Sequence, residues 1–254
     1  MTLPTQESAT SLASTSESVA TATPSGAPPD ALPRETNAEK DSSTLRVLLA
    51  DDHAVVAAGL AALLRATFDL TGVVSDGRAL VAAAAELKPD VIVTDVSMPL
   101  LNGIDAIQQI RKDQPEANIV ALTMYNEPAL AVKAFRAGAR GYVLKTSPSE
   151  ELIEAIQQVS RGGQFLTSLI AKDVIELMMQ AERAPQERGS QLTPRQREIL
   201  QLVGEGHTMK QVASLLGISP RTAESHKYEI MRILDAKSTA ELVRHAIRMD
   251  LVRD

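Results

Sequence analysis

Short apolar stretches alternate with amphipathic stretches along residues 45–161. The apolar stretches are rich in β-branched residues and predict strands, whereas the stretches between them repeat apolar residues at helical spacing. The predicted strands are 45–50, 70–74, 91–95, 119–123 and 141–144. The predicted helices are 53–67, 78–87, 102–112, 127–137 and 148–161. This alternation predicts an α/β fold, in which a doubly wound, five-stranded parallel sheet is covered by helices on both faces.

Helix-start signals divide the C-terminal part of the chain into four short helices. Thr193 with Gln196, Thr208 with Gln211, and Ser238 with Glu241 are predicted capping boxes, and Ser219-Pro220 opens the third helix, which runs to about residue 234. Gly217 ends the second helix. The second and third helices have the length and the turn of a helix-turn-helix. Upstream, Ser147 and Glu150 are predicted to form a capping box for the helix 148–161.

These patterns divide the chain into four parts. Residues 1–44 are dominated by Ser, Thr, Ala and Pro and contain no aromatic residue, so they predict a disordered tail. The α/β domain is expected at 45–165, with strand order 2-1-3-4-5, and a helical linker at 166–190. A second, small all-α domain is expected at 191–254.

Charge and composition narrow the classes of function. The chain has a net charge of −6, but residues 190–254 carry ten basic and eight acidic side chains together with three histidines. Nucleic acid is therefore the partner to test for this part. The chain has no cysteine, which excludes disulfides and thiolate zinc sites and fits a cytoplasmic protein. No apolar run approaches the roughly 20 residues that span a bilayer, so no membrane partner is expected.

Polar side chains gather where the predicted parallel strands end. Asp51 and Asp52 follow the first strand, Asp95 ends the third, Thr123 ends the fourth and Lys145 follows the fifth. Three carboxylates at one edge of the sheet repel one another, and a hard cation such as Mg²⁺ relieves that repulsion. Lys145 can meet a phosphoryl oxygen, and Thr123 offers a hydroxyl donor. The set predicts a site in which a carboxylate attacks phosphorus.

The third C-terminal helix has an apolar and a polar face. Ala223, Ile230 and Leu234 keep a helical spacing and should face the core. The residues expected to meet DNA are Arg221, Thr222, Glu224, Ser225, Lys227, Tyr228 and Arg232. Its three cations suit phosphates, whereas Glu224, Ser225 and Tyr228 suit base edges in the major groove. The alternative is an ordinary amphipathic helix with a solvated charged face.

Residues 45–161 resemble the receiver domain of two-component response regulators. ADDH at 50–53, DVSMP at 95–99, LT at 122–123 and GYVLK at 141–145 carry the resemblance. It implies that Asp95 is the phosphoacceptor and that Mg²⁺ is bound by Asp51, Asp52, Asp95 and the backbone carbonyl of Ser97. It also implies that Thr123 and Tyr142 are switch residues and that Lys145 contacts the phosphate. Thr146-Ser147-Pro148 departs from the pattern in which Pro directly follows the Lys.

Residues 192–249 resemble the LuxR-type helix-turn-helix of the NarL/FixJ subfamily. The stretch LTPRQREILQLVGEGHTMKQVASLLGISPRTAESH carries the match. It implies a packing role for Glu198 and, for His226, either a backbone contact or half-buried packing. Ile233 stands where the family usually has Lys, and Asp235 where it usually has Gly. Both departures should lower the affinity for phosphates.

The two resemblances together imply a transcription regulator and not a metabolic enzyme. A sensor histidine kinase is expected to phosphorylate Asp95, and the phosphorylated chain is expected to form homodimers that bind double-stranded promoter DNA. RNA polymerase is a further candidate partner. The alternative is a regulator or adaptor that acts through protein contacts, with weak or phosphorylation-independent DNA binding. The kinase, the promoters, the sign of regulation and the dimer interface are not encoded in any recognisable motif.

Overall fold

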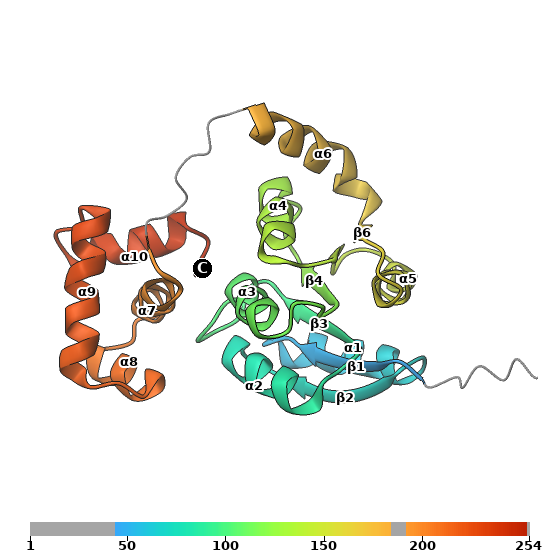
Figure 1. Cartoon of the computed structure of the whole chain (residues 1–254), viewed down its shortest axis with the longest axis horizontal. Coiled ribbons are helices and arrows are strands. Elements are labelled where there is room, and N and C mark those ends of the chain that lie inside the picture. The colour runs from blue at the N-terminus through green and yellow to red at the C-terminus, as the bar shows by residue number, and fades with distance from the viewer. Residues whose placement is uncertain (1–43, 184–191, 253–254) are drawn as a thin grey trace, which may run out of the picture. The chain divides into compact units, whose positions relative to one another are not determined.

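The computed structural model describes residues 44–183 and 192–252 (Figure 1). The predicted tail lies outside the described residues except for residue 44, and so do residues 184–190 of the predicted linker. Within the described ranges, no helix is both long and apolar enough to cross a membrane.

A parallel sheet forms the centre of the N-terminal part. Its strands are β1 (Arg46–Ala50), β2 (Asp69–Val74), β3 (Val91–Asp95), β4 (Ile119–Thr123), β5 (Gly141–Leu144) and β6 (Phe165–Leu166). They pair in the order β2-β1-β3-β4-β5-β6. The predicted order of the first five strands is confirmed, and β6 is an addition that the sequence pattern did not predict. Every residue of β3 and β4 is buried, as expected for strands covered on both faces.

Five helices cover the two faces of this sheet. They are α1 (Ala54–Arg65), α2 (Gly77–Leu87), α3 (Gly103–Asp113), α4 (Pro128–Ala137) and α5 (Ser149–Ser160). Apolar residues of α2, α3 and α4, among them Leu80 and Ile107, pack in one cluster with Leu48 and Ile92 of the sheet. Residues of α1 and α5 pack in a second cluster with the alternate strand residues. The alternation along each strand thus separates two cores, one on each face.

The start of α5 differs from the prediction. Pro148 is the N-cap residue and no side chain caps the helix, so the predicted box of Ser147 and Glu150 is wrong. The backbone N–H of Ser147 instead donates to the carbonyl of Leu144 at 2.9 Å, which closes a turn. Pro148 has an extended ψ of 145°, so the helix begins one residue later than expected.

The short strand β6 leads into α6 (Ser168–Arg183). β6 pairs with Gly141 and Tyr142 of β5. Ile170 and Val174 of α6 are buried in the cluster that contains residues of α4. The expected domain boundary after residue 165 therefore falls between the two residues of β6.

The C-terminal part contains four helices: α7 (Pro194–Gly204), α8 (Met209–Leu216), α9 (Pro220–Leu234) and α10 (Thr239–Arg248). The capping boxes at Thr193 and Thr208 are confirmed. Ser238 also caps its helix, but Glu241 reaches back to the N–H of Lys237 at 2.7 Å and not to that of Ser238. A shared core that includes Ile199, Val212, Ile230 and Leu242 holds the four helices together.

Candidate functional site

The carboxyl ends of four neighbouring strands gather the predicted polar residues. β3 lies between β1 and β4, and β4 pairs with β5. Asp51 directly follows β1, whereas Asp95 and Thr123 are the last residues of β3 and β4. Lys145 directly follows β5, and its N–H donates to the carbonyl of Thr123 at 2.7 Å. The parallel register therefore places all of them at one edge, where open α/β sheets bind their ligands.

Lys145 joins two buried carboxylates. Its Nζ lies 2.7 Å from Asp51 Oδ2 and 2.7 Å from Asp95 Oδ2. The side chains of Asp51 and Asp95 are 0% and 5% exposed, so this ion pair network is almost fully withdrawn from water. If one member were removed, a buried charge would lose its partner, which is strongly destabilising. The three side chains therefore depend on one another for stability.

Burial and the neighbouring charges change the pKa of Asp95 and of Lys145. Desolvation raises the pKa of Asp95 above its ordinary value, and the charge of Asp51 adds to that rise. The hydrogen bond and the charge of Lys145 and the N–H of Ser97 oppose the rise without cancelling it. Desolvation alone would lower the pKa of Lys145, but hydrogen bonds to Asp51 and Asp95 outweigh it, so that pKa is raised. Lys145 therefore stays cationic at neutral pH.

Backbone groups fix the remaining atoms around Asp95. Asp95 Oδ1 accepts from the N–H of Ser97 at 3.2 Å. The Thr123 hydroxyl oxygen accepts from the N–H of Tyr125 at 3.2 Å, and the Thr123 side chain is buried. Ser97 thus lies beside Asp95, while the role of its carbonyl as a metal ligand stays a prediction.

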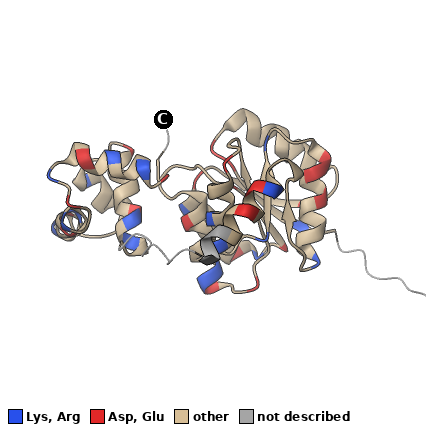
Figure 2. Ribbon diagram, turned by 90° about the horizontal axis from the view of Figure 1, so that it is seen from above, with Lys and Arg blue, Asp and Glu red and all other residues tan. Residues whose placement is uncertain are grey.

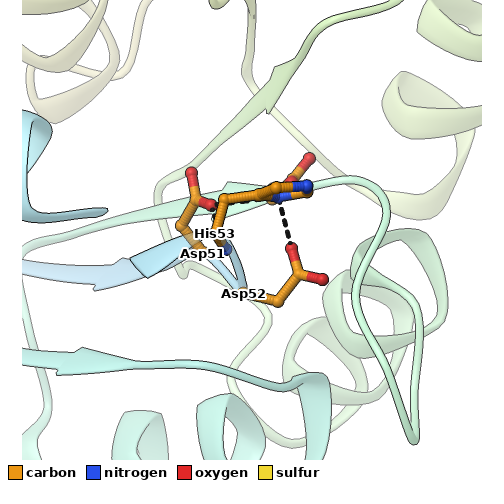
Figure 3. A group of neighbouring side chains, drawn as sticks. Asp51, Asp52 and His53 are labelled. Atoms are coloured by element: carbon orange, nitrogen blue, oxygen red, sulfur yellow. Dashed lines mark hydrogen bonds and ion pairs between the residues drawn. The ribbon is translucent and has the colours of Figure 1, made fainter. Parts of the chain in front are cut away.

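Asp52 and His53 form the outer wall of the pocket (Figure 3). His53 Nδ1 lies 2.8 Å from Asp52 Oδ1, 3.7 Å from Asp51 Oδ1 and 4.0 Å from Asp95 Oδ2. The side chains of Asp52 and His53 are 29% and 63% exposed, so this wall faces solvent. The sequence pattern singled out Asp52 but gave His53 no role, because one histidine after two aspartates is not a recognisable ligand spacing.

The acidic residues fit a divalent cation. Asp51, Asp52, His53 and Asp95 each offer one ligand atom, and these atoms lie within 4.8 Å of one another. Carboxylate oxygens are the ligands that Mg²⁺ prefers, and a site with few of them leaves room for water and a phosphate oxygen. This set of donor atoms therefore fits the expected Mg²⁺.

Tyr142 lies inside the sheet and not in the pocket. Its side chain is 0% exposed and packs in the cluster that contains residues of α3 and α4. Its backbone carbonyl accepts from the N–H of Thr167, whose hydroxyl accepts in turn from the N–H of Leu144 at 3.2 Å. Thr167, which the sequence pattern did not single out, therefore ties the end of β6 to β5, the strand that carries the predicted switch tyrosine.

The predicted DNA-contacting residues lie on the solvent side of α9. Arg221, Thr222, Ser225, Tyr228 and Arg232 are exposed, and Glu224 and Lys227 are half-buried. The same face forms an open hollow lined by most of these side chains. Ala223 and Ile230 are buried and Leu234 is half-buried, as predicted. The structure thus brings the seven residues onto one helix, with the large ring of Tyr228 67% exposed.

Contacts within the C-terminal part hold α9 and its neighbours in place. Arg195 pairs with Glu198 at 2.7 Å and donates to the carbonyl of Leu216 at 2.8 Å, so Glu198 has the expected packing role. His226 is half-buried. Figure 2 shows Lys and Arg residues scattered among Asp and Glu residues in the described parts of the chain. Any affinity for nucleic acid must therefore come from local placement of the cations and not from a large basic face.

Comparisons with known proteins agree with this geometry. Residues 47–157 match the family model of the response regulator receiver domain, and residues 190–246 match that of the bacterial regulatory proteins of the luxR family. The transcriptional regulatory protein MctR of Rhizobium johnstonii is 36% identical over 211 residues, which cover 82% of this chain and 95% of MctR.

Two solved structures extend the comparison. A LuxR-family response regulator from Aurantimonas sp. SI85-9A1 is 34% identical, with a TM-score of 0.52, over 54% of this chain and 99% of that one. The response regulator RcsB in a complex with DNA is 26% identical, with a TM-score of 0.50, over 80% of this chain and 98% of that one. The chain therefore belongs to the NarL/FixJ family of two-component response regulators, which join a receiver domain to a LuxR-type helix-turn-helix.

Proposed function

We propose that phosphorylation of Asp95 by a sensor histidine kinase switches this response regulator between a weakly and a strongly DNA-binding form. The observation that carries the proposal is the network of Asp51, Asp95 and Lys145. It holds a buried carboxylate at the end of β3, with a cation 2.7 Å from one of its oxygens. Double-stranded promoter DNA is the proposed partner of α9, and the cytoplasm, where such DNA lies, is the proposed place of action.

In the proposed reaction, a carboxylate oxygen of Asp95 attacks the phosphorus of a phosphohistidine. The new O–P bond of an acyl phosphate forms as the N–P bond to the kinase breaks, and the imidazole keeps the electron pair of that bond. Lys145 already lies against Asp95, so its ammonium can meet the negative charge of the incoming phosphoryl oxygens without a large rearrangement. Water later reverses the modification by attack on the same phosphorus.

Asp51, Asp52 and Asp95, with the Ser97 carbonyl, are the proposed ligands of Mg²⁺. When bound, the ion neutralises the phosphoryl charge and the mutual repulsion of the carboxylates. The chain itself contributes the positions of these groups. Asp51 is fixed by Lys145 and by the N–H of His53, which donates to Asp51 Oδ1 at 2.9 Å.

Thr123 and Tyr142 are the proposed relays to the rest of the molecule. The Thr123 hydroxyl sits at the end of the strand next to Asp95, and a phosphoryl group on Asp95 would recruit it away from the N–H of Tyr125. Tyr142 lies on the next strand, where its register partner on β4 is Ala121. Because β4 and β5 are hydrogen-bonded neighbours, a movement at the end of β4 could be transmitted directly to Tyr142.

On DNA, we assign phosphate contacts to Arg221, Lys227 and Arg232 and base contacts to Glu224, Ser225 and Tyr228, with Thr222 as a further contact. The exposure of this face of α9 supports the assignment. Ser225 donates to the carbonyl of Arg221 at 3.0 Å, so its hydroxyl oxygen is free to accept from a base amino group. RNA polymerase is a candidate partner of the DNA-bound protein.

The division of the chain remains part of the proposal. We place the tail at 1–44, the receiver from 45 to just beyond 165, the helical linker up to 190 and the DNA-binding domain at 191–254. The receiver boundary moves from 165 to 167, because β6 pairs with β5 and Thr167 bonds to Leu144.

The phosphoacceptor is tested with a radiolabelled small phosphodonor and with a phosphorylated kinase domain. Wild-type protein should take up acid-labile, acyl-phosphate label, and Asp95→Asn should take up none. Asp105→Asn, a carboxylate removed from another element, serves as the matched control and should still be labelled. Full labelling of Asp95→Asn would contradict the assignment.

The DNA contacts are tested by salt titration against a specific and a scrambled duplex. Lys227→Ala should weaken binding to both duplexes and lower the salt slope by about one unit, because one counterion-releasing contact is lost. Tyr228→Ala should cost roughly 1–3 kcal/mol on the specific duplex alone. Ile233→Lys should tighten binding without a change of preferred sequence. An unchanged slope in Lys227→Ala together with an unchanged ratio in Tyr228→Ala would show that α9 does not read DNA.

A second function, an adaptor that acts through protein contacts, is favoured by one observation. Asp235 is exposed at the C-terminal end of α9, and Ile233 stands where the LuxR-type pattern has a cation, so the helix carries less positive charge than that pattern implies. The two functions differ in one measurement. A regulator of promoters retards specific DNA when phosphorylated, whereas an adaptor does not retard it in either state.

A further inference from the structure

We propose that Thr167 is a positioning residue for Lys145, because its hydroxyl holds the end of β5 from the outer side of the sheet. The inference rests on the proposed function, in which Lys145 meets the phosphoryl charge at Asp95. It adds a residue that lies after the last strand and belongs neither to the acidic pocket nor to the proposed relay of Thr123 and Tyr142.

The side chain of Thr167 completes the hydrogen bonding between β6 and β5. Its backbone N–H donates to the carbonyl of Tyr142 at 3.0 Å, as in a parallel ladder. In the same pattern, the next N–H that β5 turns toward β6, that of Leu144, would donate to the carbonyl of Thr167. That carbonyl instead accepts from the N–H of Ile170 at 3.3 Å, in the first turn of α6. The Thr167 hydroxyl oxygen takes its place and accepts from the N–H of Leu144 at 3.2 Å.

The residue that Thr167 holds directly precedes Lys145. Leu144 is only 2% exposed, so its N–H depends on the hydroxyl and not on water. The carbonyl of Leu144 accepts from the N–H of Ser147 at 2.9 Å, and the N–H of Lys145 donates to the carbonyl of Thr123 at 2.7 Å. The backbone at Lys145 is therefore fixed from two sides, by β4 on one side and by Thr167 on the other.

The backbone of Lys145 determines where its ammonium lies. The side chain is 4% exposed, and Nζ lies 2.7 Å from Asp51 Oδ2 and 2.7 Å from Asp95 Oδ2. A lysine in open solvent could follow a shift of its backbone by changing its rotamer, whereas one enclosed by close-packed neighbours has few alternatives. A shift at the end of β5 would therefore move the ammonium relative to Asp95, which receives the phosphoryl group.

α6 in turn holds Thr167 in place. Thr167 is 1% exposed and directly precedes Ser168, the first residue of α6 (Figure 1). Ile170 and Val174 of α6 are buried in the cluster that contains residues of α4. The position of Lys145 therefore depends on the start of α6 as well as on the pocket that its ammonium enters.

The test measures how fast the full chain takes up label from radiolabelled acetyl phosphate in the presence of Mg²⁺. Thr167→Val and Thr167→Ala both remove the acceptor, and Thr167→Ser keeps it. Thr71→Val is the matched control, because the Thr71 hydroxyl donates to the carbonyl of Val47 at 3.0 Å on β2, at the opposite edge of the sheet. The rates are compared at a temperature where circular dichroism shows each variant to be folded.

A double-mutant cycle separates positioning of Lys145 from a general loss of stability. Residues that act through one another have effects that do not add. If Thr167 acts through Lys145, Thr167→Val should not slow labelling further in a Lys145→Met background. A purely structural role would slow labelling by the same factor in both backgrounds.

We expect Thr167→Val and Thr167→Ala to slow labelling at least about tenfold, because misplacing a reacting group by about 1 Å can slow a reaction about a hundredfold. Thr167→Ser should recover most of the wild-type rate, and Thr71→Val should retain it. Wild-type rates without the acceptor, no recovery in Thr167→Ser, or an equal loss in both backgrounds would overturn the inference while the phosphoacceptor stands. No label on the wild type, or full label on Asp95→Asn, would overturn the proposed function instead.

Discussion

Asp95 combines a buried position with a charge, and its proton equilibrium should appear in the stability of the metal-free protein. Burial raises its pKa above the ordinary 3.8, so the folded chain binds this proton more tightly than the unfolded chain does. Between the ordinary and the raised pKa the folded state holds more protons, and the free energy of unfolding therefore falls as pH rises through that window.

Asp95→Asn should remove this loss. With a chelator present, we expect the variant to gain stability over wild type as pH rises through the window, by about 1.4 kcal/mol for each unit of pKa change, and to hold that gain at higher pH. Urea unfolding at a series of pH values measures the difference. If the difference in the free energy of unfolding between the variant and wild type did not depend on pH, burial would not raise the pKa of the Asp95 carboxyl.

Asp235, which stands where the family usually has Gly, adopts a backbone conformation that favours glycine. It caps α9 in the left-handed region with a φ of 52°, where a glycine carries no steric penalty. Asp235→Gly should therefore raise the free energy of unfolding of the C-terminal domain by about 0.5–1 kcal/mol. Asp235→Ala removes the same charge but keeps a Cβ, so it should not stabilise the domain. Thermal unfolding of the three proteins separates the backbone effect from the charge effect.

At the scale of elements, the sequence predicts best where several constraints coincide. β3 could be located to the residue because an apolar, β-branched run is bounded by polar and proline residues on both sides. β6 could not, because a strand of two residues is defined by its pairing with β5 and not by any periodicity of its own. The α5 capping box failed for a related reason, since a turn at Ser147 competed with the local capping signal.

The candidate site follows the same rule. Residues at strand ends could be predicted, because the parallel topology alone brings Asp51, Asp95 and Lys145 together. The position of His53 Nδ1 between the carboxylates, and of Thr167 beside β5, depends on side-chain and loop geometry. No spacing in the chain encodes that geometry.

The loop after β3 is held by close backbone contact at Gly103. A Cβ on Gly103 would lie 1.9 Å from the carbonyl oxygen of Asp95, and its N–H already donates to the carbonyl of Val96 at 2.8 Å. Gly103→Ala should therefore push α3 away from the phosphoacceptor and destabilise the receiver by at least about 1–3 kcal/mol. Gly59→Ala is the control, because a Cβ there meets nothing within 4 Å. Denaturant unfolding and the rate of phosphorylation of both variants check the prediction.

At the scale of the whole molecule, phosphorylation should change the mass of the protein in solution. A phosphoryl group on Asp95 should favour the receiver conformation in which Lys145 and Thr123 contact it. We expect the receiver in that conformation to form a homodimer, which binds two DNA half-sites. Sedimentation equilibrium and DNA footprinting of the phosphorylated and unphosphorylated chains test this, with Asp95→Asn as the control. Identical masses and footprints in both states would contradict the switch.

The pairing of β6 with β5 has a further consequence, for the solubility of the receiver when it is made alone. The strand lies at the outer side of β5, where the N–H of Phe165 donates to the carbonyl of Arg140 and the N–H of Thr167 donates to the carbonyl of Tyr142. A chain shortened to residues 45–161 would present these carbonyls to solvent as an open template for strand addition. It should form oligomers or aggregates at concentrations where residues 45–183 stay monomeric, as light scattering would show. The two residues of β6, which follow the predicted helix 148–161, thus protect the edge of β5 from self-association.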